Sequence, residues 1–305
     1  MRREHYYDPE AKQHARGLDA IAAPATVQRL DELRLKEMDE AGIDLQVLSH
    51  TMPGFQNLDA ETAVPLARRV NDRLNEAVRA DPKRFAAFAA LPTADPKAAA
   101  DELERTVGKL GFKGAMVNGL TNGVFFDDKR FWPIFKRAQA LDVPLYLHPA
   151  TPLPPASRPI TRTTSKNTPG YCVTAGASLS RPRRGHPPRA GVFDAYPHLK
   201  ITVGHLGEGL PFYLWRISHG LRGSDGGKSF RDIFCEHFYV TTSGFFSGPA
   251  LLCCVMEMGI DRILFSVDYP FVDNPPATKW TQTLPLCAED KEKLLSANAK
   301  TAGQV

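Results

Sequence analysis

Short apolar runs alternate along the chain with longer segments of helical periodicity. Seven runs of β-branched and other apolar residues have the length of buried strands: 45–49, 85–91, 114–118, 144–148, 200–204, 238–243 and 262–268. Between most of these runs, apolar residues recur every three or four positions, which predicts helices over 30–38, 60–80, 98–110, 131–140 and 251–258. Strands that alternate with helices pair in parallel, so the pattern predicts βα units.

Two architectures are built from consecutive parallel βα units, a (β/α)8 TIM barrel and a doubly wound open sheet. The sequence has no Gly-x-Gly-x-x-Gly turn after a first strand, which argues against the dinucleotide-binding form of the open sheet. In a barrel the carboxyl ends of the strands meet at one mouth, so residues at those ends can share a site. Such residues follow six predicted strands: His50, Asn118, His148, His205, Ser243 and Asp268. The sequence therefore predicts a TIM barrel, formed as a single domain over 1–305.

The ends of the chain and one internal segment fit a regular barrel less well. Few residues precede His5 to form a first strand, and the tail 299–305 lacks an apolar closing segment. Three prolines exclude a regular helix through much of 176–190. We therefore expect a barrel with an incomplete first strand and a disrupted helix near 176–190.

Composition narrows the class of protein. The chain of 305 residues is 43% apolar and 24% charged, which is the range of globular proteins and argues against disordered or collagen-like chains. No apolar run approaches the roughly 18 residues that span a bilayer, and the first residues have no apolar signal-peptide core. We expect a soluble, cytoplasmic protein without a membrane partner.

Charge and cysteine content exclude two further interpretations. The net charge of +4 equals the contribution of four arginines within 181–189, so no distributed basic surface for nucleic acid is expected. The five cysteines form no Cys-x-x-Cys pair. In a chain without an export signal, such cysteines are expected to be reduced thiols.

Three of the residues at predicted strand ends have side chains that bind metal ions. His148 ends one apolar run, His205 follows another, and Asp268 ends a third. Each alone is compatible with a structural histidine or a helix cap. Two imidazoles and a carboxylate from separate strands together indicate a site for one metal ion, either Zn²⁺ or Mn²⁺. Glu208, three residues after His205, can orient that ring and raise its basicity, which suits proton transfer.

Longer motifs follow one another in a specific order. They include Leu35-Lys36-Glu37-Met38-Asp39, Gly111-Phe112-Lys113-Gly114, Tyr146-Leu147-His148-Pro149, Gly204-His205-Leu206-Gly207-Glu208 and Ser266-Val267-Asp268-Tyr269-Pro270-Phe271. This set spans about residues 30–150 and 190–300. It resembles the non-oxidative decarboxylases of the amidohydrolase superfamily that act on hydroxylated benzoates, such as γ-resorcylate and 2,3-dihydroxybenzoate decarboxylases.

The resemblance implies a set of metal ligands. In that family a Glu-x-His pair from the first strand, a histidine after the fifth and an aspartate after the eighth hold one divalent ion. His5, His148 and Asp268 match the last three of these ligands. Arg3 stands where the family has its glutamate, and Glu4 is one residue out of phase on a strand whose side chains alternate between faces.

The resemblance also implies a reaction, the metal-dependent decarboxylation of a small aromatic carboxylic acid such as 2,3- or 2,6-dihydroxybenzoate, with release of CO₂. Asp268 then transfers the proton to the ring, with His205 and Glu208 as its relay. Arg216 and Phe271 are expected to hold the aromatic acid. Relatives assemble as dimers or tetramers, so the resemblance implies a homo-oligomer.

Two alternatives remain open at the level of sequence. The same ligands can activate water, which would make the protein a metal-dependent hydrolase of the same superfamily. Arg3 and the segment 176–190 instead favour a catalytically impaired barrel that acts as a binding or assembly protein.

Overall fold

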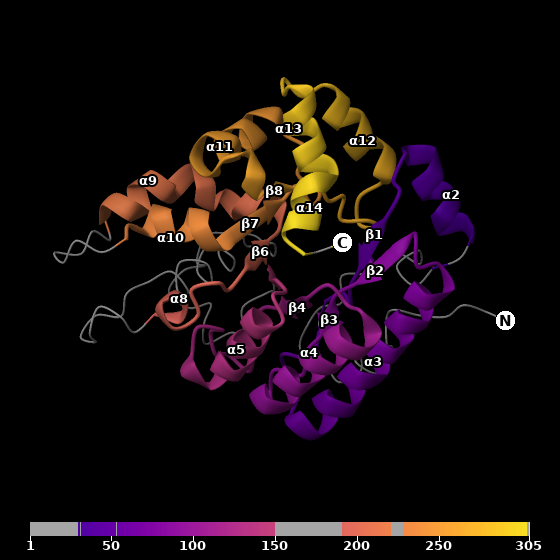
Figure 1. The fold of residues 1–305 in the computed structure, drawn as a ribbon, viewed down its shortest axis with the longest axis vertical. Helices are drawn as coiled ribbons and strands as arrows, with labels where there is room; N and C mark the ends of the chain where they lie inside the picture. The colour runs from indigo at the N-terminus through magenta and orange to yellow at the C-terminus, as the bar shows by residue number, and fades with distance from the viewer. Residues whose placement is uncertain (1–29, 31, 53, 150–190, 221–227, 304) are drawn as a thin grey trace, which may run out of the picture.

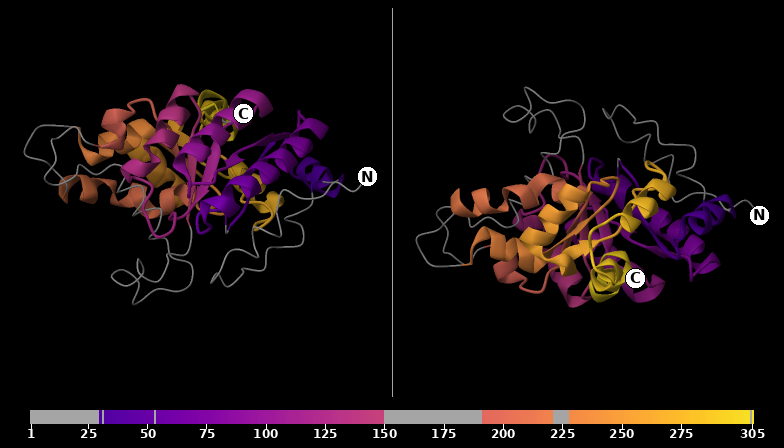
Figure 2. Two further views of the ribbon diagram at one scale, coloured as in Figure 1. Left: turned by 90° about the horizontal axis from the view of Figure 1, so that it is seen from below. Right: turned by 90° about the horizontal axis from the view of Figure 1, so that it is seen from above.

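The computed structural model describes residues 30, 32–52, 54–149, 191–220, 228–303 and 305. Figures 1 and 2 show the strands in the centre of the molecule and the helices around them. The strands are β1 (Gln46–Leu48), β2 (Phe85–Ala87), β3 (Ala89–Ala90), β4 (Ala115–Asn118), β5 (Leu145–His148), β6 (Ile201–Val203), β7 (Phe238–Thr241) and β8 (Ile263–Leu264).

The helices of the described residues lie between and after these strands. They are α2 (Glu32–Ala41), α3 (Ala60–Ala80), α4 (Pro96–Leu110), α5 (Trp132–Ala140), α8 (Val192–Ala195), α9 (Leu210–Gly220), α10 (Phe230–His237), α11 (Gly248–Met258), α12 (Asn274–Gln282), α13 (Ala288–Glu292) and α14 (Asn298–Thr301). Short 3₁₀ turns occupy Lys129–Phe131 and Ile260–Arg262, and a π-helical turn occupies Lys293–Ala297.

All of the paired strands run parallel, so the prediction of a barrel of βα units is confirmed. The strand order is β1-β2 in one sheet and β3-β4-β5-β6-β7-β8 in the other. The predicted strand 85–91 is two short strands, because its backbone changes partner at Phe88. The Phe88 N–H donates to the Leu48 carbonyl at 2.8 Å, whereas the Ala89 N–H donates to the Gly114 carbonyl at 2.8 Å. This run therefore joins the two sheets.

All five predicted helices are present, and α8, α9, α10 and α12 to α14 were missed. The reason is clearest for α9, which carries apolar side chains on its exposed face as well as its buried one. Phe212, Tyr213 and Trp215 are 73%, 51% and 64% exposed. A helix of this kind lacks the apolar and polar alternation that the sequence pattern detects. The predicted first strand and the segment 176–190 lie outside the described residues.

Local sequence signals begin and end the longer helices. The Asp59 side chain accepts a hydrogen bond from the Thr62 backbone N–H at 2.8 Å at the start of α3. Asp95 accepts from two backbone N–H groups at the start of α4, where Pro96 is the first residue. The helix ends at Gly111, which has a left-handed φ of 74°. These caps satisfy backbone groups that have no partner within the helix.

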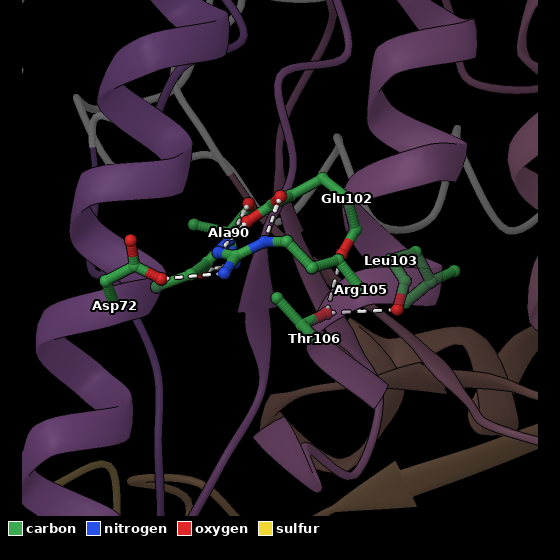
Figure 3. Close-up of polar contacts among 7 residues, drawn as sticks. Asp72, Ala90, Glu102, Leu103, Arg105 and Thr106 are labelled. Atoms are coloured by element: carbon green, nitrogen blue, oxygen red, sulfur yellow. Dashed lines mark hydrogen bonds and ion pairs between the residues drawn. The ribbon is translucent and has the colours of Figure 1, made fainter. Parts of the chain in front are cut away.

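A buried polar cluster joins α3 and α4 to β3 (Figure 3). The Asn71 side chain is fully buried and exchanges hydrogen bonds with both backbone groups of Ala90, at 2.9 and 3.0 Å. Its Nδ2 also donates to Glu102 Oε1 at 2.8 Å. Arg105 donates to both oxygens of Glu102 and to Asp72. Asn71 thus satisfies two backbone groups of the buried strand β3, where water does not reach them.

The C-terminal residues correct one expectation. The tail was expected to lack an apolar closing segment, yet Leu294 and Ala302 are 1% and 0% exposed, and Ala302 packs with Tyr239 and Leu264. The Asn298 side chain donates to the carbonyls of Ile260 and Ile263, each at 2.8 Å. Within 299–305 the small residue Ala302 makes the buried contact with β7 and β8, so the tail packs against the sheet without an apolar run.

Two further expectations concern the described residues alone. Their cysteines, Cys235, Cys253, Cys254 and Cys287, are free thiols. Within the same ranges, every helix is too short or too polar to cross a membrane. The single domain over 1–305 stays a prediction.

We expect Asn71→Ala to lower the free energy of unfolding by about 2–3 kcal/mol, because the N–H and carbonyl of Ala90 would remain buried without their partner. Asp72→Asn is the matched control, since it removes an ion pair whose carboxylate is 52% exposed. Its effect should stay below about 1 kcal/mol. Urea unfolding followed by circular dichroism measures both, and equal midpoints for the two variants would contradict this assignment.

Candidate active site

A cavity opens at the carboxyl ends of β1, β4, β5 and β8. It is lined by Arg34, Val47, Leu48, Ser49, Thr51, Met116, Asn118, His148, Asp268, Tyr269 and Phe271. The register pairs Asn118 with His148 at the ends of β4 and β5. Parallel pairing thus brings strand ends together at one mouth, as the barrel prediction required.

His148 is the last residue of β5, and its ring lies within the cavity wall. Its Nδ1 lies 2.7 Å from the Pro149 carbonyl oxygen. Burial lowers the pKa of His148, and the positive charge of His205 lowers it further. His148 is therefore neutral at physiological pH, which is the protonation state in which imidazole binds a metal ion.

His205 stands at the start of a left-handed turn that follows β6. The φ angles of His205, Leu206, Gly207 and Glu208 are 50°, 51°, 75° and 52°. Left-handed backbone costs roughly 1–2 kcal/mol for each residue that has a Cβ. Gly207 is required here, because a Cβ would lie 2.9 Å from Pro211 Cδ and 3.1 Å from Val240 Cγ1.

The turn places His205 between two carboxylates. Its Nδ1 lies 2.5 Å from Glu208 Oε1, and its Nε2 lies 3.8 Å from Asp268 Oδ2. Burial by itself would lower the pKa of His205, but contact with Asp268 and Glu208 outweighs burial and raises this pKa to about 9. His205 therefore carries an extra proton at neutral pH, whereas His148 is neutral. The centroids of the two rings are 5.8 Å apart.

Asp268 follows β8 after a short irregular segment, because the strand predicted over 262–268 ends at Leu264. Asp268 has a left-handed φ of 73°, which is rare for a residue with a side chain. Its carbonyl accepts hydrogen bonds from the N–H groups of Phe271 at 2.9 Å and Val272 at 3.2 Å. This tight turn directs the carboxylate toward the two histidines.

The donor set fits a divalent metal ion. His148, His205 and Asp268 each offer one ligand atom, and these atoms all lie within 4.8 Å of one another. Two imidazoles and one carboxylate are donors that Zn²⁺ and Mn²⁺ accept. The predicted grouping of these three residues is confirmed. His5, the further ligand implied by resemblance, lies outside the described residues.

The two residues predicted to bind substrate have different positions. Phe271 lines the cavity and is 44% exposed. Arg216 lies on α9 with an exposed side chain, and it is not among the residues that line the cavity. The structure of this chain thus places Phe271, and not Arg216, beside the histidines and Asp268.

Two of the other polar residues predicted at strand ends, His50 and Ser243, are buried in contact with neighbouring side chains. His50 is buried and stacks on Phe55 at a centroid distance of 4.9 Å. The Ser243 hydroxyl is buried and hydrogen bonds with the Thr241 hydroxyl at 2.7 Å. Of this group, Asn118 lines the cavity together with His148 and Asp268.

Arg34 and Tyr269 line the cavity and were missed as site residues. Arg34 is 4% exposed and lies on the buried face of α2 with Met38, four positions further on. An arginine at the centre of an apolar helical face is a signal that the sequence contains. The predicted pattern at 30–38 used the apolar residues Leu30, Leu33, Leu35 and Met38 and did not consider Arg34.

The fold and the cavity together define a parallel βα barrel with a cluster of metal-binding side chains at its mouth. The Amidohydrolase family matches residues 23–302. The chain therefore belongs to the amidohydrolase family, and the resemblance found in its motifs is confirmed.

Several similar proteins within the family are named as decarboxylases. Gamma-resorcylate decarboxylase of Rhizobium radiobacter is 37% identical over 316 residues, covering 97% of this chain and 95% of the relative. The structure of 2,6-dihydroxybenzoate decarboxylase complexed with 2,6-dihydroxybenzoate is similar with a TM-score of 0.82 at 35% identity, covering 99% of this chain and 98% of that one. The structure of dihydroxybenzoic acid decarboxylase of Polaromonas sp. JS666, solved with manganese and the inhibitor 2-nitroresorcinol, is similar with a TM-score of 0.78 at 38% identity. The match covers 90% of this chain and 86% of that one.

We expect His205 in the metal-free protein to titrate with a pKa of about 9, and Glu208→Gln to lower that pKa by removing a negative charge. Because the folded pKa lies above the ordinary value, the charged ring stabilises the fold at neutral pH. That contribution is lost as the pH rises through about 9. Histidine-labelled NMR measures the titration, and a His205 signal that titrates below neutrality would refute the arrangement.

Proposed function

We propose that this protein is a metal-dependent carboxy-lyase that removes CO₂ from a hydroxylated benzoic acid of the 2,3- or 2,6-dihydroxybenzoate type. The observation that carries the proposal is the cluster of His148, His205 and Asp268 in one cavity, in a chain of this family. Relatives at 35–38% identity that are named for this reaction support the choice of substrate class.

His148 and Asp268 are the described residues that would hold the metal ion, with His5 as a third ligand by resemblance. Zn²⁺ or Mn²⁺ bound there would supply a positive charge for the substrate's carboxylate and ortho hydroxyl. The neutral state of His148 supports its role, since a protonated ring has no lone pair to donate.

The proton that the reaction requires is stored and transferred by Asp268, His205 and Glu208. Loss of CO₂ breaks the bond between the ring and the carboxyl carbon, and the electron pair of that bond stays on the ring carbon, which must receive a proton. His205 stores a proton between the two carboxylates, and Asp268 passes it to the ring carbon. The 3.8 Å between His205 Nε2 and Asp268 Oδ2 is long for a hydrogen bond, as is common before substrate binds.

Phe271 and Met116 give the cavity apolar surface for an aromatic ring. Phe271 extends from the turn that carries Asp268, so the ring would lie close to the proton donor. We propose Arg216 as a further contact to the aromatic acid, and this role rests on resemblance alone. The Arg216 side chain is exposed on α9, away from the residues that line the cavity.

We also propose a homo-oligomer, a dimer or tetramer. The exposed aromatic side chains of Phe212, Tyr213 and Trp215 on α9 support this proposal, because clustered exposed apolar residues mark contact surfaces. Sedimentation velocity of the purified protein tests it.

The purified protein should contain about one Zn²⁺ or Mn²⁺ ion per chain, because the described residues bring together one cluster of possible ligands. The same sample should release CO₂ from 2,3- or 2,6-dihydroxybenzoate. Plasma mass spectrometry and a CO₂ assay measure the two quantities. Bound metal without CO₂ release would favour the hydrolase, and a folded, metal-free, inert chain would favour the impaired barrel.

Asp268→Asn should abolish CO₂ release, because an amide can neither accept nor deliver the proton. Its thermal midpoint should stay close to that of the parent, since the amide fits the same space. Asp273→Asn is the matched control: it is an exposed aspartate five positions further on, whose side chain makes no capping hydrogen bond, and it should leave the rate unchanged. An Asp268→Asn variant with the parental kcat would reject the role given to Asp268.

A further inference from the structure

Asp268 lies in the left-handed region of backbone conformation, which is unfavourable for a residue with a Cβ even though aspartate adopts it more readily than most. A residue with a Cβ in the left-handed region persists only where the surrounding structure holds it. The hydrogen bonds to its carbonyl fix the turn that follows. These hydrogen bonds lie within the turn, so they do not hold the turn against the rest of the barrel.

The next residue, Tyr269, is held by helix α2. Its hydroxyl donates a hydrogen bond to Glu37 Oε2, and the Arg34 guanidinium lies over its ring at 4.7 Å from the centroid. Arg34 and Glu37 are three positions apart and so lie on adjacent turns of one helix face. The helix therefore holds the ring at its face and at its hydroxyl end.

The same helix also contacts strand β1. Arg34 Nε donates to Gln46 Oε1 at 2.8 Å, and Gln46 is the first residue of β1. Within the described residues, β8 pairs with β7 and β1 pairs with β2, and α2 contacts the segments that follow β8 and begin β1. Figure 1 shows α2 beside α12 at this side of the molecule. Arg34 thus connects the turn of Asp268 to a second strand.

We propose that Arg34 and Glu37 are positioning residues which, through Tyr269, hold the carboxylate of Asp268 toward His148 and His205. The inference rests on the proposed function for its catalytic meaning, because Asp268 is there both metal ligand and proton donor. Outer groups that orient a metal-binding carboxylate change metal affinity although they do not touch the ion.

Three variants test the contact between Tyr269 and Glu37. Tyr269→Phe removes the hydroxyl and keeps the ring over Arg34, Glu37→Ala removes the acceptor, and Glu37→Gln keeps an acceptor oxygen. We expect the first two to raise the Kd for Mn²⁺ about tenfold and Glu37→Gln to stay within about twofold of the parent. Because the two groups act as one contact, the double variant Tyr269→Phe/Glu37→Ala should match the single variants.

Glu40→Ala is the matched control on the same helix, since Glu40 is exposed and pairs only loosely with Lys36 at 3.6 Å. Electron paramagnetic resonance titration gives the Kd for Mn²⁺, and a thermal scan of the same samples reports folding. Parental Kd values in Tyr269→Phe and Glu37→Ala would overturn the inference. So would a weakened Kd that appears only in variants that unfold at the temperature of the titration.

The outcomes separate this inference from the proposed function. A parent protein that binds Mn²⁺ but releases no CO₂ defeats the proposed function, and the comparison of Kd values still decides the inference. If the parent binds no Mn²⁺, crystal structures of the parent and of Tyr269→Phe decide it instead. We expect the separation of His205 Nε2 and Asp268 Oδ2 to exceed 3.8 Å in the variant, and an unchanged separation would overturn the inference.

Discussion

The placement of the His205 imidazole between the carboxylates of Glu208 and Asp268 is the interaction on which the site depends. It keeps a proton on one ring while burial keeps the neighbouring ring of His148 neutral. Two chemically identical side chains thereby take two protonation states, because their surroundings move their pKa values in opposite directions. The neutral ring suits a metal ligand, and the protonated ring suits a proton store beside a substrate that must gain one.

This arrangement requires strained backbone on two strand ends. His205 and Asp268 both have left-handed φ angles, so the fold must supply contacts that compensate. At His205 the compensation is local, because Gly207 allows close packing against Pro211 and Val240, and the Cys254 thiol lies 3.6 Å from the Leu206 carbonyl oxygen. At Asp268 part of the support comes from α2, which is more than two hundred residues earlier in the chain.

Much of the barrel follows from patterns within short windows of sequence. A buried parallel strand is a short apolar run, and a helix against a sheet has an apolar face, so both are recognisable without knowing their partners. The grouping of His148, His205 and Asp268 could be predicted for the same reason, since a polar residue that follows an apolar strand lies at the barrel mouth. α9 was missed because its exposed face carries Phe212, Tyr213 and Trp215, and the packing of the tail was missed because Ala302 is a single small residue.

The sequence by itself determined the alternation of strands and helices, the family, and the grouping of His148, His205 and Asp268. Only the tertiary structure decided that burial keeps His148 neutral and that Asp268 joins the neighbouring Glu208 beside His205. It also decided that Arg34 lies in the cavity wall and that Arg216 lies on an exposed helix face. The physical reason is that periodicity reports which face of an element is buried, whereas charge and hydrogen bonding depend on the neighbours that the packed fold supplies.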